Sequence, residues 1–157
     1  MQLKSISYSN NQNIPVKYCR QTVTGGQNIS PRYSWEDVPA GTQSFILMMV
    51  DHHPIASNWV HWLIVDIPSN INSIPEGASK TFNIPVKSIE LINTFGLKGY
   101  DGPQPPKGSG KHNYDTILYA LDIEHTGLTG EISESELLKK IKPHILDQAI
   151  LTGFFER

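Results

Sequence analysis

Residues 44–68 read SFILMMVDHHPIASNWVHWLIVDIP, and this stretch decides the fold class. Two nearly continuous apolar runs of strand length, residues 44–50 and 61–67, stand on either side of a polar connection. Runs of this kind are typical of strands that are covered on both faces. The connection carries one Asp and two His, and a third His opens the second run. We therefore expect two neighbouring core strands with titratable groups gathered where they meet.

The rest of the chain also favours strands over helices. A third apolar run covers residues 116–123, and shorter strands are expected at residues 14–19 and 33–35. Residues 96–113 contain too many Gly and Pro for regular structure. A long irregular loop in a compact domain is usually functional or disordered, so this segment is a natural place for a site.

The C-terminal part carries the one clear helix pattern. Ser133 and Glu136 match a capping box, and an apolar face at helical spacing follows them. Pro143 is expected to end or kink this helix and to begin a second helical turn that stops at Gly153. Strands dominate and do not alternate with helices. The sequence therefore predicts an all-β, mainly antiparallel sandwich that carries a C-terminal helical segment.

Length and composition narrow the function. The 157 residues suit a single domain, residues 1–157, and the formal net charge of -2 argues against nucleic-acid binding, which needs clustered Lys and Arg. Cys19 is the only cysteine, so no internal disulfide is possible. No signal peptide or membrane-spanning apolar run is evident. We expect a cytoplasmic protein with no integral membrane segment.

Four residues are the main candidates for chemistry: Asp51, His61, His112 and Tyr114. Each also has an ordinary structural explanation, since a strand-terminal Asp often makes a turn and a His in an apolar run can be a core residue. His112 and Tyr114 are two positions apart, so in a strand they would share one face. Both carry polar ends, which favours a functional role for the pair.

Three chemistries use such a set of residues. A metal site is disfavoured, because no H-x-H or H-x3-H spacing is present and the cysteine is isolated. Nucleophilic catalysis would require an activated Ser, Thr or Cys; Ser30, Ser57 and Ser109 are present, but none lies in a nucleophile-elbow motif. Anion binding fits best, because imidazoles, a phenol and loop amides are all hydrogen-bond donors.

Ordered along the chain are several short motifs: Asn28-x-Ser30-Pro31, Trp35, Val38-Pro39-x-Gly41-Thr42, Asp51-x-x-Pro54, His61-Trp62, Gly99-Tyr100-x-Gly102-Pro103-x-Pro105-Pro106 and His112-x-Tyr114. In this combination the chain resembles the bacterial and archaeal branch of the phosphatidylethanolamine-binding protein family, also called Raf-kinase-inhibitor-like proteins. The resemblance begins at about residue 20 and continues to the C-terminus.

The resemblance implies a large antiparallel sheet packed on a smaller one, with an anion pocket near one end. It implies that the pocket is lined by Asp51, His61, Gly102, Pro103, His112 and Tyr114. It also makes the bonds before Pro54 and within Pro105-Pro106 candidates for cis geometry, and a homodimer plausible. The ligand would be a small anion or phosphorylated headgroup, and no cofactor is implied.

The chain departs from the family at its first motif, which is usually Asp-Pro-Asp-Ala-Pro and here reads Asp51-His52-His53-Pro54. A possible donor replaces an acceptor, so we expect a less negative site, with His53 and Pro54 as additional site residues. The leading expectation is a non-enzymatic binding protein, regulatory towards a kinase or protease by family analogy. The alternative is a hydrolase of phosphate or ester substrates that uses Asp51, His61 and His112 as its acid–base set.

Overall fold

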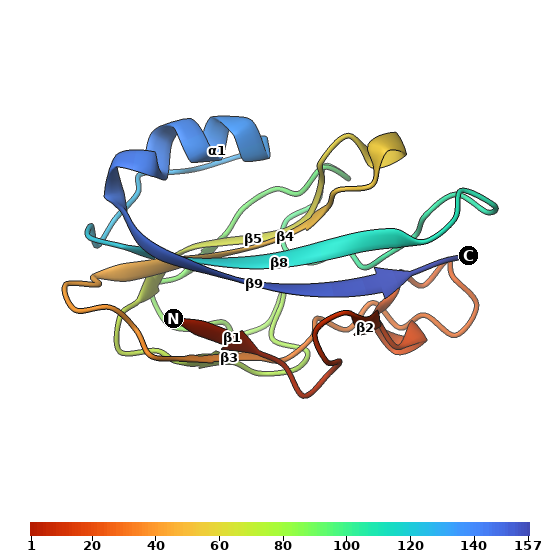
Figure 1. The fold of residues 1–157 in the computed structure, drawn as a ribbon, viewed down its shortest axis with the longest axis horizontal. Helices are drawn as coiled ribbons and strands as arrows, with labels where there is room; N and C mark the ends of the chain where they lie inside the picture. Colours follow the sequence, from red (N-terminus) through yellow and green to blue (C-terminus); the bar gives the residue numbers. More distant parts are fainter.

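The structure is a computed structural model that describes residues 1–157, and it consists of two stacked sheets and one short helix (Figure 1). The large sheet has six strands in the order β2-β9-β8-β4-β5-β7, and the small sheet has three in the order β1-β3-β6. All named strand pairs are antiparallel except β2 with β9. The expected all-β, mainly antiparallel sandwich is confirmed.

The elements of the chain, in order, are β1 (Gln2–Lys4), β2 (Gln12–Asn13), η1 (Val16–Tyr18), β3 (Tyr33–Glu36), β4 (Ser44–Asp51), η2 (Pro54–Ala56), β5 (Trp59–Pro68), β6 (Ser73–Ile74), β7 (Ile89–Glu90), β8 (His112–Leu121), α1 (Glu134–Ile141), η3 (Lys142–His144) and β9 (Ile145–Phe155). The long strands β4, β5, β8 and β9 form the middle of the large sheet.

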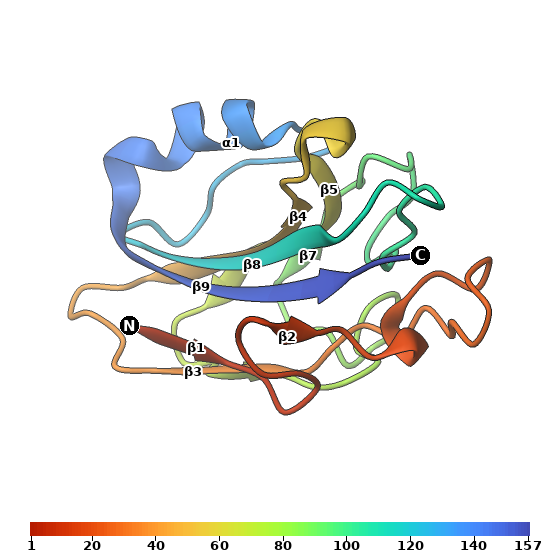
Figure 2. The ribbon, with the colours of Figure 1, turned by 45° about the vertical axis from the view of Figure 1, so that its right-hand side comes forward.

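The continuous apolar run in β4 is explained by two cores, one on each face of the large sheet. Phe45, Leu47 and Met49 pack in the core shared with the small sheet. Ile46 and Met48 alternate with them and pack in a second core, to which helix α1 contributes Leu137 and Ile141. Figures 1 and 2 show the large sheet as the middle layer, with α1 on one face and β1 and β3 on the other. Because both faces of β4 are buried, polar and apolar residues do not alternate in its sequence.

Two expected elements are wrong. Residues 14–19 form no strand, because Val16–Tyr18 is a 3-10 turn after Pro15. Pro143 lies at the start of only the three-residue turn η3, and the residues that follow this turn form strand β9 instead of a longer helical turn. In β9 the buried Ala149, Leu151 and Gly153 alternate with more exposed residues, which is the period of a strand.

The short helix α1 begins as its sequence predicts. Ser133 is the N-cap, its hydroxyl accepts from the backbone N–H of Glu136, and the side chain of Glu136 accepts from the backbone N–H of Ser133. This capping box satisfies backbone donors that the first turn of a helix leaves free. None of the helices has the length and apolar character needed to cross a bilayer.

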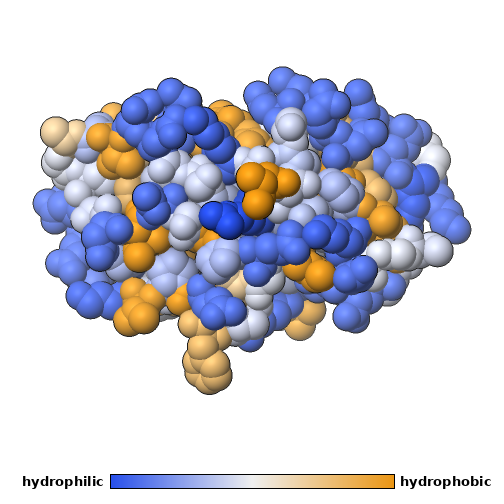
Figure 3. All heavy atoms as spheres, turned by 90° about the horizontal axis from the view of Figure 1, so that it is seen from below, coloured by the Kyte–Doolittle hydropathy of each residue, from blue (hydrophilic) through white to orange (hydrophobic).

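Seen from the side of the small sheet, the surface mixes polar and apolar residues, and the apolar ones are scattered rather than continuous (Figure 3). Phe82 is the most exposed large apolar side chain, and Ile6 and Val86 follow it with equal exposure. Scattered exposure of this kind is normal for protein surfaces.

Candidate functional site

A pocket of about 240 Å³ opens where β4 ends and β5 and β8 begin. The strands contribute Asp51, Trp59, His61, His112 and Tyr114 to its lining. One wall comes from Ile55 and Ala56 in the β4–β5 connection, and the other from Phe95 and the loop segment 104–106. Segments that are far apart in the sequence therefore meet around one small cavity.

The register of the large sheet explains why the polar residues meet. Asp51 is directly opposite Tyr114 on β8 and opposite Trp59 on β5. His112 precedes Tyr114 by two residues and His61 follows Trp59 by two, so the alternation of strands places each pair on one face. The four residues predicted as the main candidates thus lie together around the pocket. That they bind a ligand stays a prediction.

Asp51 orients His112. Its Oδ2 accepts a hydrogen bond from Nδ1 of His112 at 2.7 Å, and its Oδ1 accepts from the backbone N–H of His53 at 2.9 Å. Both side chains are almost completely buried. On the other side of the ring, Nε2 of His112 is 2.9 Å from the hydroxyl oxygen of Ser109. Asp51 therefore pairs with His112 and makes no hydrogen bond to His61.

His61 is held by the main chain. Its Nδ1 donates to the carbonyl oxygen of Asp101 at 2.6 Å, and burial lowers the pKa of the imidazole. The neutral ring then has a lone pair on Nε2, which has no hydrogen-bond partner in the protein. His61 therefore offers the pocket an acceptor.

Tyr114 offers the opposite group. Its hydroxyl is buried and has no hydrogen-bond partner among the protein atoms. Burial, assisted by the negative charge of Asp51, raises the pKa of the phenol far above its ordinary value. The hydroxyl therefore keeps its proton and remains a free donor.

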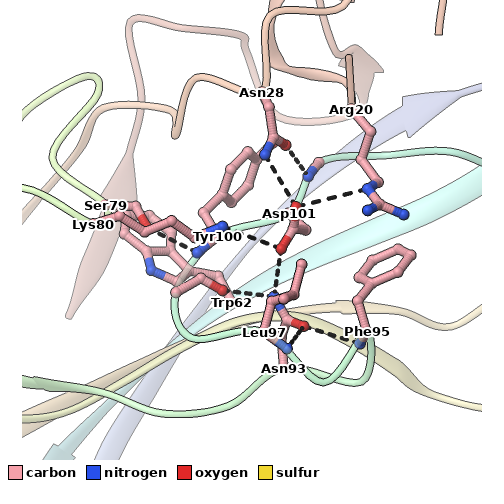
Figure 4. A network of polar contacts seen from close by, with 12 residues as sticks. Arg20, Asn28, Trp62, Ser79, Lys80, Asn93, Phe95, Leu97, Tyr100 and Asp101 are labelled. Atoms are coloured by element: carbon pink, nitrogen blue, oxygen red, sulfur yellow. Dashed lines mark hydrogen bonds and ion pairs between the residues drawn. The ribbon is translucent and has the colours of Figure 1, made fainter. Parts of the chain in front are cut away.

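The main-chain carbonyl of Asp101 accepts the hydrogen bond from His61. The loop that carries this carbonyl is fixed by the side-chain carboxylate of the same residue (Figure 4). This buried carboxylate accepts from the side-chain amides of Asn28 and Asn93, each at 3.0 Å, and from the ammonium of Lys80 at 3.2 Å. In Figure 4 the two Asn side chains approach it from two sides, and Arg20 approaches to 3.6 Å. Together these contacts to its carboxylate hold Asp101 so that its main-chain carbonyl can accept the hydrogen bond from His61.

The other predicted site residues lie next to the pocket but do not line it. The N–H of Gly102 donates to Asn28, and a Cβ at Gly102 would be 1.9 Å from the carbonyl oxygen of Tyr18. The carbonyl of Pro103 accepts from the backbone N–H of Arg20. These two residues therefore serve close backbone packing rather than the lining that the resemblance implied.

His53 and Pro54 also lie outside the lining of the pocket. The ring of His53 stacks on His112 with centroids 3.8 Å apart, and Pro54 is the exposed first residue of η2. No peptide bond of the chain is cis, so the expected cis bonds before Pro54 and within Pro105-Pro106 are absent. Trans is the favoured form even before proline, by about 0.5–1 kcal/mol.

Several residues of the site were not predicted from the sequence. Trp59 and Phe95 pack edge to face with centroids 5.1 Å apart, and the guanidinium of Arg20 lies 4.1 Å from the centre of the Phe95 ring. Asp101 lies between Tyr100 and Gly102, and a carboxylate within a Gly/Pro loop next to a strand is a usable signal of a structural role. No group of three or more His, Cys, Asp or Glu side chains is arranged to hold a metal ion.

Comparison with known proteins agrees with this architecture. The family model for phosphatidylethanolamine-binding protein matches residues 4–156. A UPF0098 protein of Aquifex aeolicus is 38% identical over 158 aligned residues, covering 100% of this chain and 89% of the relative. YbhB of Escherichia coli, also a UPF0098 protein, is 37% identical over 132 residues, covering 83% of each chain.

Solved structures show the same fold. Escherichia coli YbcL, described as a new member of the mammalian PEBP family, superposes with a TM-score of 0.91 at 27% identity, covering 99% of this chain and 98% of that one. A PEBP homologue of Chlamydia trachomatis gives 0.82 at 32% identity, covering 99% and 97%. Sequence and structure together establish that the chain belongs to the phosphatidylethanolamine-binding protein family.

Proposed function

We propose that the pocket binds a small phosphate-type anion, either free or as the headgroup of a phosphorylated molecule, and that this binding is non-enzymatic. The observation that carries the proposal is the pair of unused hydrogen-bonding groups at the pocket. The hydroxyl of Tyr114 is a donor without an acceptor, and Nε2 of His61 is an acceptor without a donor.

A partly protonated phosphate complements both groups. One of its anionic oxygens can accept from the Tyr114 hydroxyl, while its P–OH group can donate to Nε2 of His61. Buried polar groups left unpaired are costly, so a ligand that pairs both recovers that cost on binding. A fully deprotonated anion could satisfy only Tyr114.

Size and charge support the same class of ligand. The volume of about 240 Å³ is below the usual 300–1,000 Å³ of drug-sized sites, so the pocket suits a headgroup rather than a whole lipid. Arg20, which contacts Phe95 and donates to Gln104 at 3.0 Å, places a positive charge beside two lining residues. Family analogy extends the proposal to a regulatory role towards a protein partner, as a cytoplasmic protein able to form a homodimer.

Calorimetric titration tests the binding with inorganic phosphate and phosphoethanolamine as separate probes. Tyr114→Phe removes only the free donor and should weaken binding about tenfold or more, because a hydrogen bond to a charged group contributes about 1.5–3 kcal/mol. Tyr119→Phe is the matched control, since Tyr119 lies on the same strand but packs in the core on the other face. Equal affinities for wild type and Tyr114→Phe would remove the hydroxyl from the site. If phosphoethanolamine binds more strongly than inorganic phosphate, the ligand is a headgroup. If the two probes bind equally, the ligand is a free anion.

A further inference from the structure

Ser109, His112 and Asp51 form a continuous hydrogen-bonded row that the proposed anion site does not use. The hydroxyl oxygen of Ser109 is 2.9 Å from Nε2 of His112, and Nδ1 of His112 is 2.7 Å from Oδ2 of Asp51. Asp51 and His112 are 5% and 1% exposed, so the carboxylate and imidazole are shielded from water. This is the arrangement of nucleophile, base and orienting acid in a serine acyltransfer triad.

The order of the three groups fixes where the proton goes. Because the Asp51 carboxylate can only accept, Nδ1 of His112 carries the hydrogen in the neutral ring. The lone pair of Nε2 then faces the Ser109 hydroxyl and can remove its proton. The carbonyl oxygen of Pro106, 2.6 Å away, is the alternative acceptor for that hydroxyl when the ring is an imidazolium. His112 can therefore take the proton of Ser109 only when its ring is neutral.

The turn around Ser109 is built so that a substrate can reach it. Gly108 and Gly110 have φ of +76° and +86°, in the left-handed region, and an added Cβ at either would meet nothing within 4 Å. Pro106 and His112, which Ser109 contacts on its two sides, both line the pocket. The hydroxyl thus lies between the pocket wall and an open glycine turn.

A backbone donor next to Ser109 is free to stabilise a developing oxyanion. The backbone N–H of Gly110, the residue that follows Ser109, donates to no acceptor in the protein. In serine hydrolases the N–H of the residue after the nucleophile is one of the groups that stabilise the oxyanion. No motif marks this role, because Ser109 lies in a Gly-Ser-Gly turn rather than a strand-to-helix elbow.

We propose that Ser109 is a nucleophile and that the protein transfers the acyl group of small carboxylic esters to water. Ser109 Oγ attacks the ester carbonyl carbon while its proton moves to Nε2 of His112, giving a tetrahedral oxyanion. The carbon–oxygen bond to the alcohol breaks, and the alcohol leaves with the proton from His112. Water then attacks the acyl-serine, its proton passes through His112 to Ser109, and the carboxylic acid is released. Asp51 acts as a positioning residue through His112.

Covalent labelling of the full chain tests the proposal independently of anion binding. Diisopropyl fluorophosphate should add one label, mapped to Ser109 by peptide mass spectrometry, and p-nitrophenyl acetate should be hydrolysed with the same serine dependence. Ser109→Ala should abolish labelling, and His112→Gln should slow it about 100-fold or more, as for loss of a general base. Ser69→Ala, in an exposed loop, should label at the wild-type rate.

Asp51→Asn tests the positioning role. It should slow labelling by a similar factor and lower kcat for p-nitrophenyl acetate while leaving KM unchanged, whereas a merely structural carboxylate would leave kcat as it is. Absence of label on the Ser109 peptide of wild-type protein, or unchanged labelling in Ser109→Ala, would overturn the proposal. Because the wild-type peptide map decides alone, a misfolded variant does not obscure the result. Phosphate titration of the same samples separates this outcome from the binding proposal.

Discussion

At the scale of single residues, the hydroxyl of Tyr114 is the group that the fold leaves unsatisfied. It is buried beside the Asp51 carboxylate, which raises the pKa of the phenol, and it makes no well-formed hydrogen bond in the protein. Leaving such a group unpaired costs about 1–3 kcal/mol of folding free energy. An unpaired hydroxyl is expected at a pocket when the bound ligand supplies its hydrogen-bond acceptor.

Tyr114→Phe should therefore leave the free energy of unfolding unchanged or raise it by about 1 kcal/mol, because it removes an unpaired buried polar group. Urea denaturation without added anions measures this. Tyr33→Phe is the contrast, since that hydroxyl is within 2.8 Å of Tyr8 and 2.9 Å of Thr116, and it should lose about 1 kcal/mol. A clear loss of stability in Tyr114→Phe would show that its hydroxyl already has a partner.

Asp101 is the residue on which the geometry of the pocket loop depends. Asp101→Asn would place an amide group among the donors of Asn28, Asn93 and Lys80, and it would leave Lys80 without its charge partner. We expect the free energy of unfolding to fall by about 1–3 kcal/mol, because the buried carboxylate loses acceptors for the amides of Asn28 and Asn93. Asp122→Asn, on an exposed carboxylate that bonds His144, should change it by less than about 0.5 kcal/mol. Equal effects would mean that the network does not hold the loop.

At the scale of elements, His52 connects three parts of the chain. Its Nδ1 is 2.6 Å from a carboxylate oxygen of Asp115 on β8, and its Nε2 is 3.1 Å from Glu134 at the start of α1. Two carboxylates are both acceptors, so only the imidazolium can donate to each. Burial opposes protonation, but the bonds to Asp115 and Glu134 outweigh it and raise the pKa of His52. The charge thus ties the β4–β5 connection to the helix.

The stability that His52 contributes should depend on pH. A raised pKa in the folded state means that the contribution is complete below the ordinary His value of about 6.5 and is lost as the pH rises through the raised value. His52→Gln should therefore lower the free energy of unfolding relative to wild type more at about pH 6 than at about pH 9. His125→Gln, on a 64% exposed side chain, should differ little from wild type at either pH. A deficit for His52→Gln that grows towards high pH would contradict the account.

Strand β9 depends on Gly153, which the sequence pattern predicts as a helix stop. A Cβ at Gly153 would lie 2.6 Å from Ile14 Cγ1 and 2.7 Å from Tyr8 Cε2. Gly153→Ala should cost about 1–3 kcal/mol through overpacking, measured by urea denaturation. Ile150→Thr, on the exposed side of the same strand, should change stability by no more than about 0.5 kcal/mol. If both variants were equally stable, the packing of β2 and β9 around Gly153 would differ from that described.

At the scale of the whole molecule, local pattern predicted the middle of the sandwich. The double apolar runs of β4 and β5 and the capping box of α1 are local signals, and all three elements form as expected. Strand β9 was misread because its alternation is weak next to a helix and a proline. It forms because β8 needs a partner along its whole length, and the two strands pair from His112 to Leu121.

The site was predictable only where strands carry it. Asp51, His61, His112 and Tyr114 come from strand ends whose register follows from the fold. Ser109 and Asp101 come from the irregular loop, where no period relates a residue number to a direction. Their contacts are made by turns with left-handed glycines and by a network spanning 73 positions between Asn28 and Asp101. Such contacts exist only in the assembled molecule.

A crystal structure of the protein soaked with phosphate tests the central claim most directly. The account predicts one phosphate in the pocket, with an oxygen within about 3.2 Å of the Tyr114 hydroxyl and another within that distance of Nε2 of His61. A pocket that holds only water at saturating phosphate, or a phosphate bound elsewhere with both groups still unpaired, would contradict it.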